Sequence, residues 1–560
     1  MTENLIATLV LLSPVAFAIC ALASWFQPGG KPSIVKSFSS FTTIFTIVIA
    51  AVSGFFILQN DAVQTMTIGF YEIGLSLRLD PLSILMFSMI ALLGFIIVKF
   101  SFNYLDGDQR QGAFLGRLCA TIASVQLLVL SGNLGLLFLS WVLTSISLHR
   151  LLVFYSDRPR AIIAAKKKFI MARAGDLSLF IAFVLLYNHF GTGDLGTIFQ
   201  QIKENQALQS NFANVELAGV FLALAAIFKS AQFPFHGWLI EVMETPTPVS
   251  ALLHAGLLNA GPFLITRFAF VVEGTTLAPV ILIIFGGFTG WFASVAFLTQ
   301  PSVKTALGYS SVAHMGFMLM ICGLGVYPAA MLHLVAHSFY KAHAFLSSGS
   351  VIDTVRSNKV ALPERLGSIP RLLLSVFLAM AVYLAFSFAW GIDPLEELSL
   401  LATGAIIVMG LSQMLAPTID ANGFKSGILR TTIMATLVAA AFFTLESATH
   451  LLLATQLPTL SQPNMIITVL IAGVLLLYGI TVVGQMLAPS LATSSYWTKV
   501  GFHFRNGWYA NAILDRLVGA LNNSSSGTPQ PNFSNKAFNI PTEENPSDKK
   551  PKRESVLESV

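Results

Sequence analysis

Long apolar segments recur along the whole chain, separated by short polar loops. Each segment has the length of roughly 20 residues that an α-helix needs to cross the hydrocarbon core of a bilayer, and the pattern predicts about fifteen such helices. The expected helices lie at 5–25, 38–59, 81–101, 113–131, 133–155, 168–190, 213–231, 247–270, 277–299, 303–323, 326–352, 371–390, 397–417, 428–453 and 464–488. The fold class that this pattern predicts is an all-α polytopic membrane protein.

Two local patterns refine this prediction. The first apolar segment follows Glu3 without a basic residue, which is not typical of a cleaved signal peptide, so we take it as the first helix. Between the second and third helices, Tyr71 to Leu79 alternates polar and apolar residues. This alternation predicts a short β-hairpin on the outer surface.

The composition supports a membrane location. Of the 560 residues, 55% are hydrophobic and 11% are charged, whereas soluble domains carry about 25% charged residues. A water-soluble globular protein is therefore excluded, and the net charge of +5 needs no nucleic acid to explain it. The cysteines Cys20, Cys119 and Cys322 are far apart in the sequence, and no Gly-rich phosphate motif occurs. We therefore expect no disulfide framework, no metal site and no cofactor.

The distribution of charge predicts an orientation. With an outside N-terminus, the loops assigned to the cytoplasm carry Lys31, Lys36, Arg110, Arg158, Arg160, Lys166, Lys167, Lys168, Arg356, Lys359, Arg365, Lys425, Lys499, Arg505 and Arg516. The loops assigned to the outside carry Arg78, Lys203, Asp61, Glu72, Asp80, Asp194, Glu204, Asp393, Glu396 and Glu397. Because basic residues favour cytoplasmic loops, we expect a bacterial inner-membrane protein with the N-terminus outside and the C-terminus in the cytoplasm.

Lys229 is the first charged residue that the bilayer should disfavour. It ends an apolar run, and Pro234 follows closely, so the helix should break just beyond the lysine. Broken helices at membrane depth line cavities, and a desolvated lysine there can gain and lose a proton during transport. The alternative is a lysine at a helix end that extends its amine to the interface.

The next segment adds a histidine and two carboxylates. His254 lies inside a helix that begins near Pro246, and it can exchange a proton near neutral pH or form a hydrogen bond with a neighbouring helix. Glu241 and Glu244 precede that helix, either as entry groups for an ion or as loop residues without a role.

His333, His337 and Lys341 follow one another at intervals of four residues on the eleventh helix. This spacing places them on one side of the helix, with a rise of about 6 Å per step. We interpret the row as a proton relay; the alternative is three separately bonded core residues. Asp176, on the sixth helix, is a candidate counter-charge for Lys229 or a partner for Arg173.

Three segments also carry a family resemblance: 228–255 (FKSAQFPFHGWLIEVMETPTPVSALLHA), 304–317 (KTALGYSSVAHMGF) and 337–350 (HSFYKAHAFLSSGS). They resemble the proton-conducting, antiporter-like membrane subunits of respiratory complex I, of Mrp-type antiporters and of the Dab inorganic carbon transporter. The resemblance covers about residues 70–355 and implies a proton path through Lys229, His254, His333, His337 and Lys341. Lys304, His343 and His149 are further candidates.

The resemblance also implies two inverted five-helix repeats, each with a discontinuous helix. The resulting organisation is N-terminal helices and hairpin (1–112), first repeat (113–270), second repeat (271–420), C-terminal transmembrane helices (421–490), an amphipathic cytoplasmic segment (491–520) and a disordered polar tail (521–560).

Departures from the family pattern point to one subfamily. Complex I and Mrp relatives carry a glutamate after the tryptophan of the fifth helix, whereas here Val142 follows Trp141, and the segment 372–389 contains no charged residue. The segments 147–155 and 164–170 most resemble the DabB-type subunit. The resemblance then implies a subunit that couples the flow of H⁺, with Na⁺ as the alternative ion, to bicarbonate or CO2 uptake.

The chain itself would then be no enzyme, because the carbon chemistry is expected in a DabA-type, zinc-containing partner related to carbonic anhydrase. Two alternatives stay open. One is an ion-pumping subunit of an NADH or ferredoxin dehydrogenase complex or of an Mrp-type antiporter. The other is a structural membrane scaffold, suggested by Val142 and the uncharged segment 372–389.

Overall fold

The computed structural model describes residues 2–60, 62–155, 158–207, 213–242, 245–350, 367–391, 398–420, 427–460, 462–487 and 495–522. Met1–Val518 form one compact unit, and Gly519–Val560 form a second, of which only the first residues are described. The tail that we expect to be disordered therefore lies almost entirely outside the described residues.

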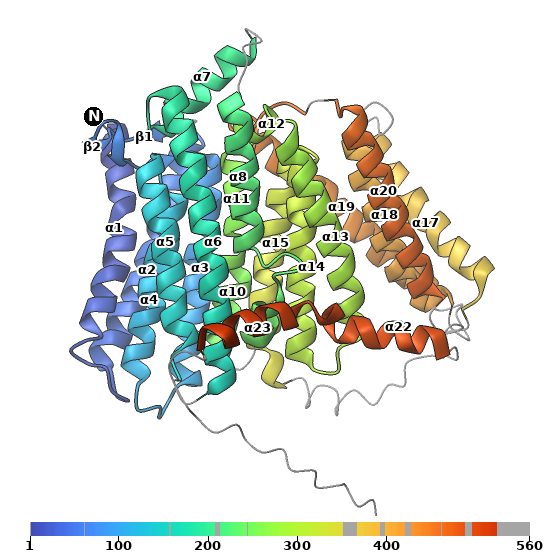
Figure 1. The fold of residues 1–560 in the computed structure, drawn as a ribbon, viewed down its shortest axis with the longest axis horizontal. Helices are drawn as coiled ribbons and strands as arrows, with labels where there is room; N and C mark the ends of the chain where they lie inside the picture. The colour runs from blue at the N-terminus through green and yellow to red at the C-terminus, as the bar shows by residue number, and fades with distance from the viewer. Residues whose placement is uncertain are drawn as a thin grey trace, which may run out of the picture. The chain divides into compact units, whose positions relative to one another are not determined.

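The compact unit is a bundle of long helices (Figure 1). The long helices are α1 (Thr2–Ala23), α2 (Ser33–Ile57), α3 (Pro81–Tyr104), α4 (Gln111–Val129), α5 (Leu134–Leu152), α6 (Pro159–Phe190), α8 (Ala213–Lys229), α13 (Leu277–Leu298), α14 (Val303–Gly323), α15 (Tyr327–Leu346), α17 (Ile369–Ala389), α18 (Leu398–Ile419), α19 (Ile428–Leu453) and α20 (Met465–Met486). Shorter helices are α7 (Leu195–Ala207), α9 (Gly237–Glu241), α10 (Thr247–Ala255), η2 (Leu257–Asn259), α11 (Ala260–Arg267), α12 (Ala269–Glu273), η3 (Ser348–Ser350), α22 (Ser495–Arg505), η5 (Gly507–Tyr509) and α23 (Asn511–Asn522).

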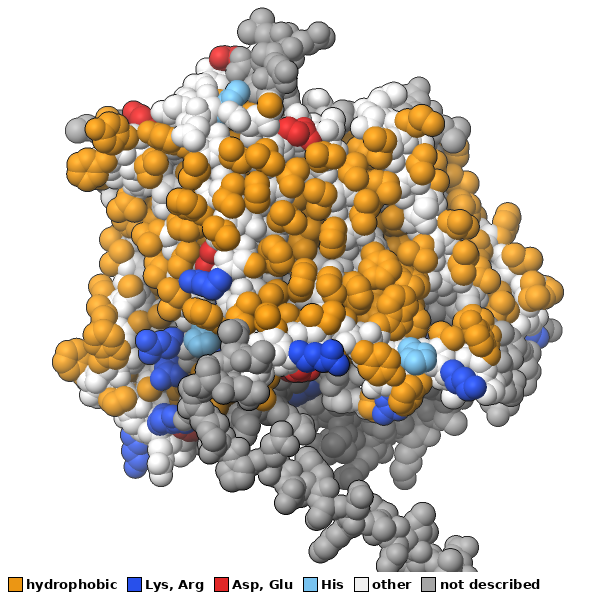
Figure 2. All heavy atoms as spheres, viewed as in Figure 1, with side chains coloured by type: hydrophobic (Ala, Val, Ile, Leu, Met, Phe, Trp, Pro, Cys, Tyr) orange, Lys and Arg blue, Asp and Glu red, His pale blue; other side chains and the backbone are white. Residues whose placement is uncertain are grey.

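Thirteen helices within the described residues are long and apolar enough to cross a membrane. One of them is the segment Thr247–Arg267, which combines α10, η2 and α11. The other two expected membrane helices correspond to α8 and α15. Figure 2 shows hydrophobic side chains over the middle of one face and many Lys and Arg side chains along its lower edge, as expected for a multi-pass membrane protein.

The predicted hairpin is confirmed, although its strands begin earlier than expected. Strand β2 (Ile68–Phe70) pairs antiparallel with β3 (Ile73–Leu75), and β1 (Val63–Gln64) pairs with β4 (Arg78–Leu79). Tyr71 and Glu72 connect β2 to β3 with φ values of 49° and 62°. Positive φ at both central residues is the signature of the tight hairpin turn that matches strand twist.

The start of α6 differs from the prediction. We expected a loop that contains Lys166, Lys167 and Lys168, but α6 begins at Pro159 and includes all three. Proline suits the first turn of a helix, where its missing N–H costs nothing. Lys167 is 0% exposed and Lys168 is 5% exposed. Their assignment to a loop is therefore wrong, because both amines find partners on elements distant in sequence.

The predicted helix break after Lys229 is confirmed. Helix α8 ends at this residue, Ala231 has a φ of 51°, and the chain resumes helical structure only at α9. The following membrane segment is also irregular, since Gly256 separates α10 from η2. Irregular backbone therefore lies within the segment 228–255, which carries the family resemblance, and directly after it at Gly256.

A buried ionic network joins the hairpin to the bundle. Asp80 caps α3 by accepting from the backbone N–H and the hydroxyl of Ser83, both at 2.8 Å. Its Oδ2 accepts from Arg78 Nε at 2.7 Å and from Arg267 Nη1 at 2.5 Å. Asp80 is 0% exposed and the side chain of Arg267 is 2% exposed. This network therefore connects β4, α3 and α11.

Candidate functional site

Lys229 lies against α5, where its amine meets only uncharged acceptors. The Nζ donates to Ser145 Oγ at 2.8 Å, to the Trp141 carbonyl at 3.1 Å and to Thr144 Oγ1 at 3.3 Å. It also lies 4.1 Å from the centre of the Trp141 ring, within range of a cation–π contact. The amine is thus held by dipoles that can bind either its charged or its neutral form.

Asp176 pairs with Arg173 on its own helix rather than with Lys229. The Arg173–Asp176 contact is 2.5 Å, and the side chain of Asp176 is 8% exposed. Within the described residues, no carboxylate lies within 4.0 Å of Lys229. Asp176 nevertheless faces the same region, where Lys229 and Lys168 act on it together with Arg173 as opposing charges. It supplies a negative charge near a lysine whose fifth-helix carboxylate is replaced by Val142.

Lys168 is a second buried amine in this region that sequence reasoning missed. Its Nζ donates to the Ser145 carbonyl at 2.8 Å, so Ser145 contacts both lysines. His149 lies one turn along α5 from Ser145, and its ring is 5.4 Å from that of Phe169. The Nδ1 of His149 is buried without a hydrogen-bond partner.

The predicted row on α15 forms part of a larger histidine cluster. His333 Nε2 lies 2.9 Å from Nδ1 of His314 on α14, and the rings of His314 and His337 are 5.0 Å apart. The rings of His333 and His337 are stacked, with centres 6.3 Å apart. His337 is 4% exposed, and neither of its ring nitrogens has a partner. Three imidazoles from two helices therefore meet in one place, where His337 is buried and His314 and His333 are half-buried.

Lys341 and His254 extend this cluster toward α10. Lys341 is 0% exposed and donates to the Leu307 carbonyl at 3.1 Å. His254 stacks on Phe345 at 4.3 Å, and both of its ring nitrogens are buried without partners. Buried polar atoms without partners in a native protein call for an explanation, such as water or a transported ion.

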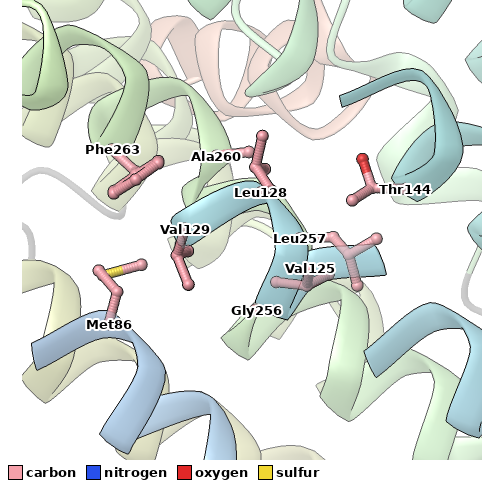
Figure 3. Close-up of a pocket in the computed structure, with 9 residues that line it drawn as sticks. All are labelled: Met86, Val125, Leu128, Val129, Thr144, Gly256, Leu257, Ala260 and Phe263. Atoms are coloured by element: carbon pink, nitrogen blue, oxygen red, sulfur yellow. The ribbon is translucent and has the colours of Figure 1, made fainter. Parts of the chain in front are cut away.

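A small apolar cavity lies beside Thr144 and Gly256 (Figure 3). Its lining includes Thr144, which contacts Lys229, and Gly256, two residues beyond His254. About 10 Å³ of it is open to the centre of a water molecule, which is about the space that one water needs. The lining is therefore mainly hydrocarbon, and Thr144 connects the cavity to Lys229.

The remaining candidates lie outside these two groups. Glu241 accepts from Lys167 at 2.7 Å through both carboxylate oxygens, and Glu244 lies outside the described residues. Lys304 reaches Thr247 Oγ1 at 3.5 Å, close to the start of α10. His343 is exposed and lies on another face of α15 from the histidine cluster.

Glu241 instead takes part in a contact with the C-terminal segment. Lys167 also binds Asp515 at 2.5 Å and Asn511 Oδ1 at 3.1 Å, while Asn511 donates to Glu241. Beside it, Trp508 packs within 6.3 Å of the rings of Phe233, Phe288, Trp291, Phe292 and Phe504. The segment after the helix break is thereby held by α22, η5 and α23.

Two family models match the chain. The model described as NADH:quinone oxidoreductase/Mrp antiporter, TM, matches residues 131–416, just over half of the chain. The model described as NADH-Ubiquinone oxidoreductase (complex I), chain 5 N-terminus, matches residues 66–115. Together they include the hairpin, both groups of buried titratable residues and the broken helices.

Curated relatives come from two kinds of complex. A probable inorganic carbon transporter subunit DabB2 from Halothiobacillus neapolitanus is 38% identical over 381 residues, covering 67% of this chain and 68% of the relative. The probable inorganic carbon transporter subunit DabB from Hydrogenovibrio crunogenus is 36% identical over 357 residues, covering 63% and 66%. NADH-quinone oxidoreductase subunit L from Escherichia coli is 36% identical over 288 residues, covering 51% and 47%. The matches thus span about half to two thirds of these relatives.

Solved structures share the fold. The Mrp complex from Dietzia sp. DQ12-45-1b matches with a TM-score of 0.55 and 20% identity, over 94% of this chain and 57% of that chain. The membrane-bound sulfane sulfur reductase, an archaeal respiratory membrane complex, matches with a TM-score of 0.56 and 18% identity, over 92% and 99%. The chain therefore belongs to the NADH:quinone oxidoreductase/Mrp antiporter family of membrane subunits.

Proposed function

We propose that this chain is the ion-translocating, energy-coupling membrane subunit of an inorganic carbon uptake system, and that the ion is H⁺. The relatives named as inorganic carbon transporter subunits support this assignment, because the match to DabB2 has a higher identity and covers more of the chain than the matches to subunit L of Buchnera aphidicola and of Escherichia coli. The absence of a glutamate after Trp141 supports the same subfamily.

One observation carries the proposal of proton flow: titratable side chains gather inside the bundle with few compensating charges. Ionisable groups at membrane depth are costly and mark ion pathways by default. Lys229, bound by uncharged acceptors at a helix break, would take up and release the proton. His254, His333, His337 and Lys341, together with His314, would relay it across the second half of the bundle.

We assign the supporting roles as follows. Asp176 provides the counter-charge near Lys229, and the cavity beside Thr144 is where water would join the two groups. The repeat at 113–270 would contribute the broken segment beyond Lys229, and the repeat at 271–420 would contribute the histidines and the lysine of α14 and α15. We place the N-terminus outside a bacterial inner membrane and the C-terminus in the cytoplasm, as the distribution of loop charges favours.

The carbon chemistry is assigned to a partner. We propose a DabA-type, zinc-containing subunit related to carbonic anhydrase, on the basis of the DabB names of the relatives. The alternative is an ion-pumping subunit of a dehydrogenase complex or Mrp-type antiporter. The 36% identity to NADH-quinone oxidoreductase subunit L of Escherichia coli supports that alternative.

Affinity purification of the tagged full chain from native membranes tests the choice between these two functions. The proposal predicts one abundant partner that carries zinc, measured by metal analysis of the purified complex. Recovery of iron–sulfur subunits and several antiporter-like chains would instead establish the dehydrogenase alternative.

Bicarbonate uptake in intact cells tests the coupling ion. A protonophore should abolish uptake, and Lys229→Ala should do the same while the complex still assembles. His343→Ala is the matched control, because His343 is an exposed titratable residue on α15. Uptake that survives the protonophore but stops with a sodium ionophore would make Na⁺ the coupling ion.

A further inference from the structure

We propose that Lys168 is a proton-carrying residue of this path and exchanges a proton with Lys229 beside Ser145. This inference rests on the proposed function and adds a residue that the sequence pattern places among loop charges. Helices α5, α6 and α8 meet at Ser145.

Ser145 is the meeting point of two lysines from different helices. Its carbonyl accepts from Lys168 Nζ at 2.8 Å, and its hydroxyl accepts from Lys229 Nζ at 2.8 Å. The two amines are therefore separated by the atoms of a single residue. A side-chain hydroxyl can both accept and donate, so Ser145 can contact a charged and a neutral amine in turn.

The charges around this place do not balance if both amines are protonated. Lys168, Lys229 and Arg173 would carry three positive charges, and Asp176 is the carboxylate that faces them. Asp176 is already paired with Arg173 at 2.5 Å. His149 of α5 also faces Lys168 and adds no negative charge in either protonation state. A single proton shared by the two lysines leaves one uncompensated positive charge in place of two.

Lys168 also lacks the partners of a structural lysine. Its neighbour Lys167 is such a structural lysine, because its amine contacts Glu241, Asp515 and Asn511. Lys168 is 5% exposed, yet within the described residues its amine has a single protein acceptor, a backbone carbonyl. An amine held this weakly can lose its proton without breaking an ion pair.

The step conserves atoms and charge. A proton leaves Nζ of Lys168 and binds neutral Nζ of Lys229, so Lys168 becomes the neutral amine and the pair keeps one positive charge. His149, which is partly exposed and near Lys168, is placed to return a proton to Lys168. No oxidant, metal or covalent intermediate takes part.

Proton flux in proteoliposomes that contain the whole complex tests the inference. A pH-sensitive dye inside the vesicles reports the rate, which is normalised to the amount of assembled complex. The variants are Lys168→Gln, Lys168→Arg and Lys168→His, and the control is Lys166→Gln, which removes an exposed lysine from the same helix. Arginine keeps the positive charge but cannot release a proton, whereas histidine can exchange one.

We expect Lys168→Gln and Lys168→Arg each to lower the flux by about tenfold or more. Lys168→His should retain a measurable part of the flux, and Lys166→Gln should match the wild type. A normal rate in Lys168→Gln would overturn the inference, because proton flux would then need no titratable group at this position. A normal rate in Lys168→Arg would overturn it as well, because a fixed positive charge would then be sufficient for the flux. Loss of assembly in all three variants would assign Lys168 to folding and overturn it as well.

The same experiment separates this inference from the proposed function. A wild-type complex that moves no protons would overturn the proposed function, and the inference with it. A wild-type complex that moves protons, combined with unaffected Lys168 variants, would leave the proposed function standing and refute the role of Lys168 alone.

Discussion

Replacement of Asp80 by asparagine should destabilise the protein strongly, because it breaks a fully buried ion pair. Asp80 is 0% exposed and accepts from both Arg78 and Arg267, and the side chain of Arg267 is 2% exposed. Removal of one partner of a buried pair costs about 3–5 kcal/mol, since the other charge is left without compensation. Asparagine can still cap α3 through Ser83, whereas Asp80→Ala should cost about 1 kcal/mol more.

The measurement is equilibrium unfolding of the purified protein in mixed micelles with increasing SDS. Asp106→Asn is the matched control, because Asp106 pairs with Lys36 at 3.8 Å and its side chain is 79% exposed. Exposed pairs contribute about 0–1 kcal/mol. Adding Arg267→Gln to Asp80→Asn should recover part of the loss by removing the unpaired charge. A loss for Asp80→Asn no larger than that for Asp106→Asn would refute the reasoning.

The same pair predicts a pH dependence. Burial opposes the charge of Asp80, but Arg267 and Arg78 more than offset it and hold the pKa of this carboxyl well below its usual value. The stabilisation is therefore complete above the unfolded-state pKa of about 3.9 and is lost as the pH falls toward the folded-state pKa. Asp80→Asn should lack this component, so its stability should depend less on pH in that range. An unchanged acid dependence would contradict the assignment.

Three further predictions concern the site. His314→Ala and His333→Ala should each reduce bicarbonate uptake per assembled complex, and the double variant should lose little more, because the two rings share one contact; losses that multiply would indicate independent roles. Glu241→Gln should speed proteolysis of the C-terminal segment in native membranes more than Asp515→Asn does, because the Asp515 side chain is 50% exposed and that of Glu241 is 28% exposed; equal rates would contradict the contact with Lys167. Thr144→Val should slow proton flux by removing the only side-chain hydroxyl at the cavity, and a normal rate would show that protons pass elsewhere.

Local patterns were sufficient to predict several features of the site. The break after Lys229 follows from a lysine and a proline close together in the sequence, and the row from His333 to Lys341 follows from helical spacing. His314 lies within segment 304–317, which carries the family resemblance, so the same segment contained the signal for it. The structure adds its contact with His333.

Contacts between distant residues could not be predicted from the sequence. The sequence pattern places Lys167 and Lys168 in a loop. Their burial could not be predicted, because it depends on Glu241, Asp515 and Ser145, which lie on other elements. The Asp80–Arg267 pair joins residues 187 positions apart. Periodicity and local charge contain no information on such pairs, since a buried charge is tolerated only where a distant partner meets it.

The most direct test of the central claim is simultaneous measurement of proton and carbon flow in proteoliposomes that contain the purified complex. An inward bicarbonate flux, followed with labelled bicarbonate, should depend on an imposed proton gradient and should acidify the lumen of wild-type vesicles. Both fluxes should disappear together in Lys229→Ala and remain in His343→Ala. Carbon flux that proceeds at the wild-type rate in Lys229→Ala, or without any movement of protons, would contradict the account.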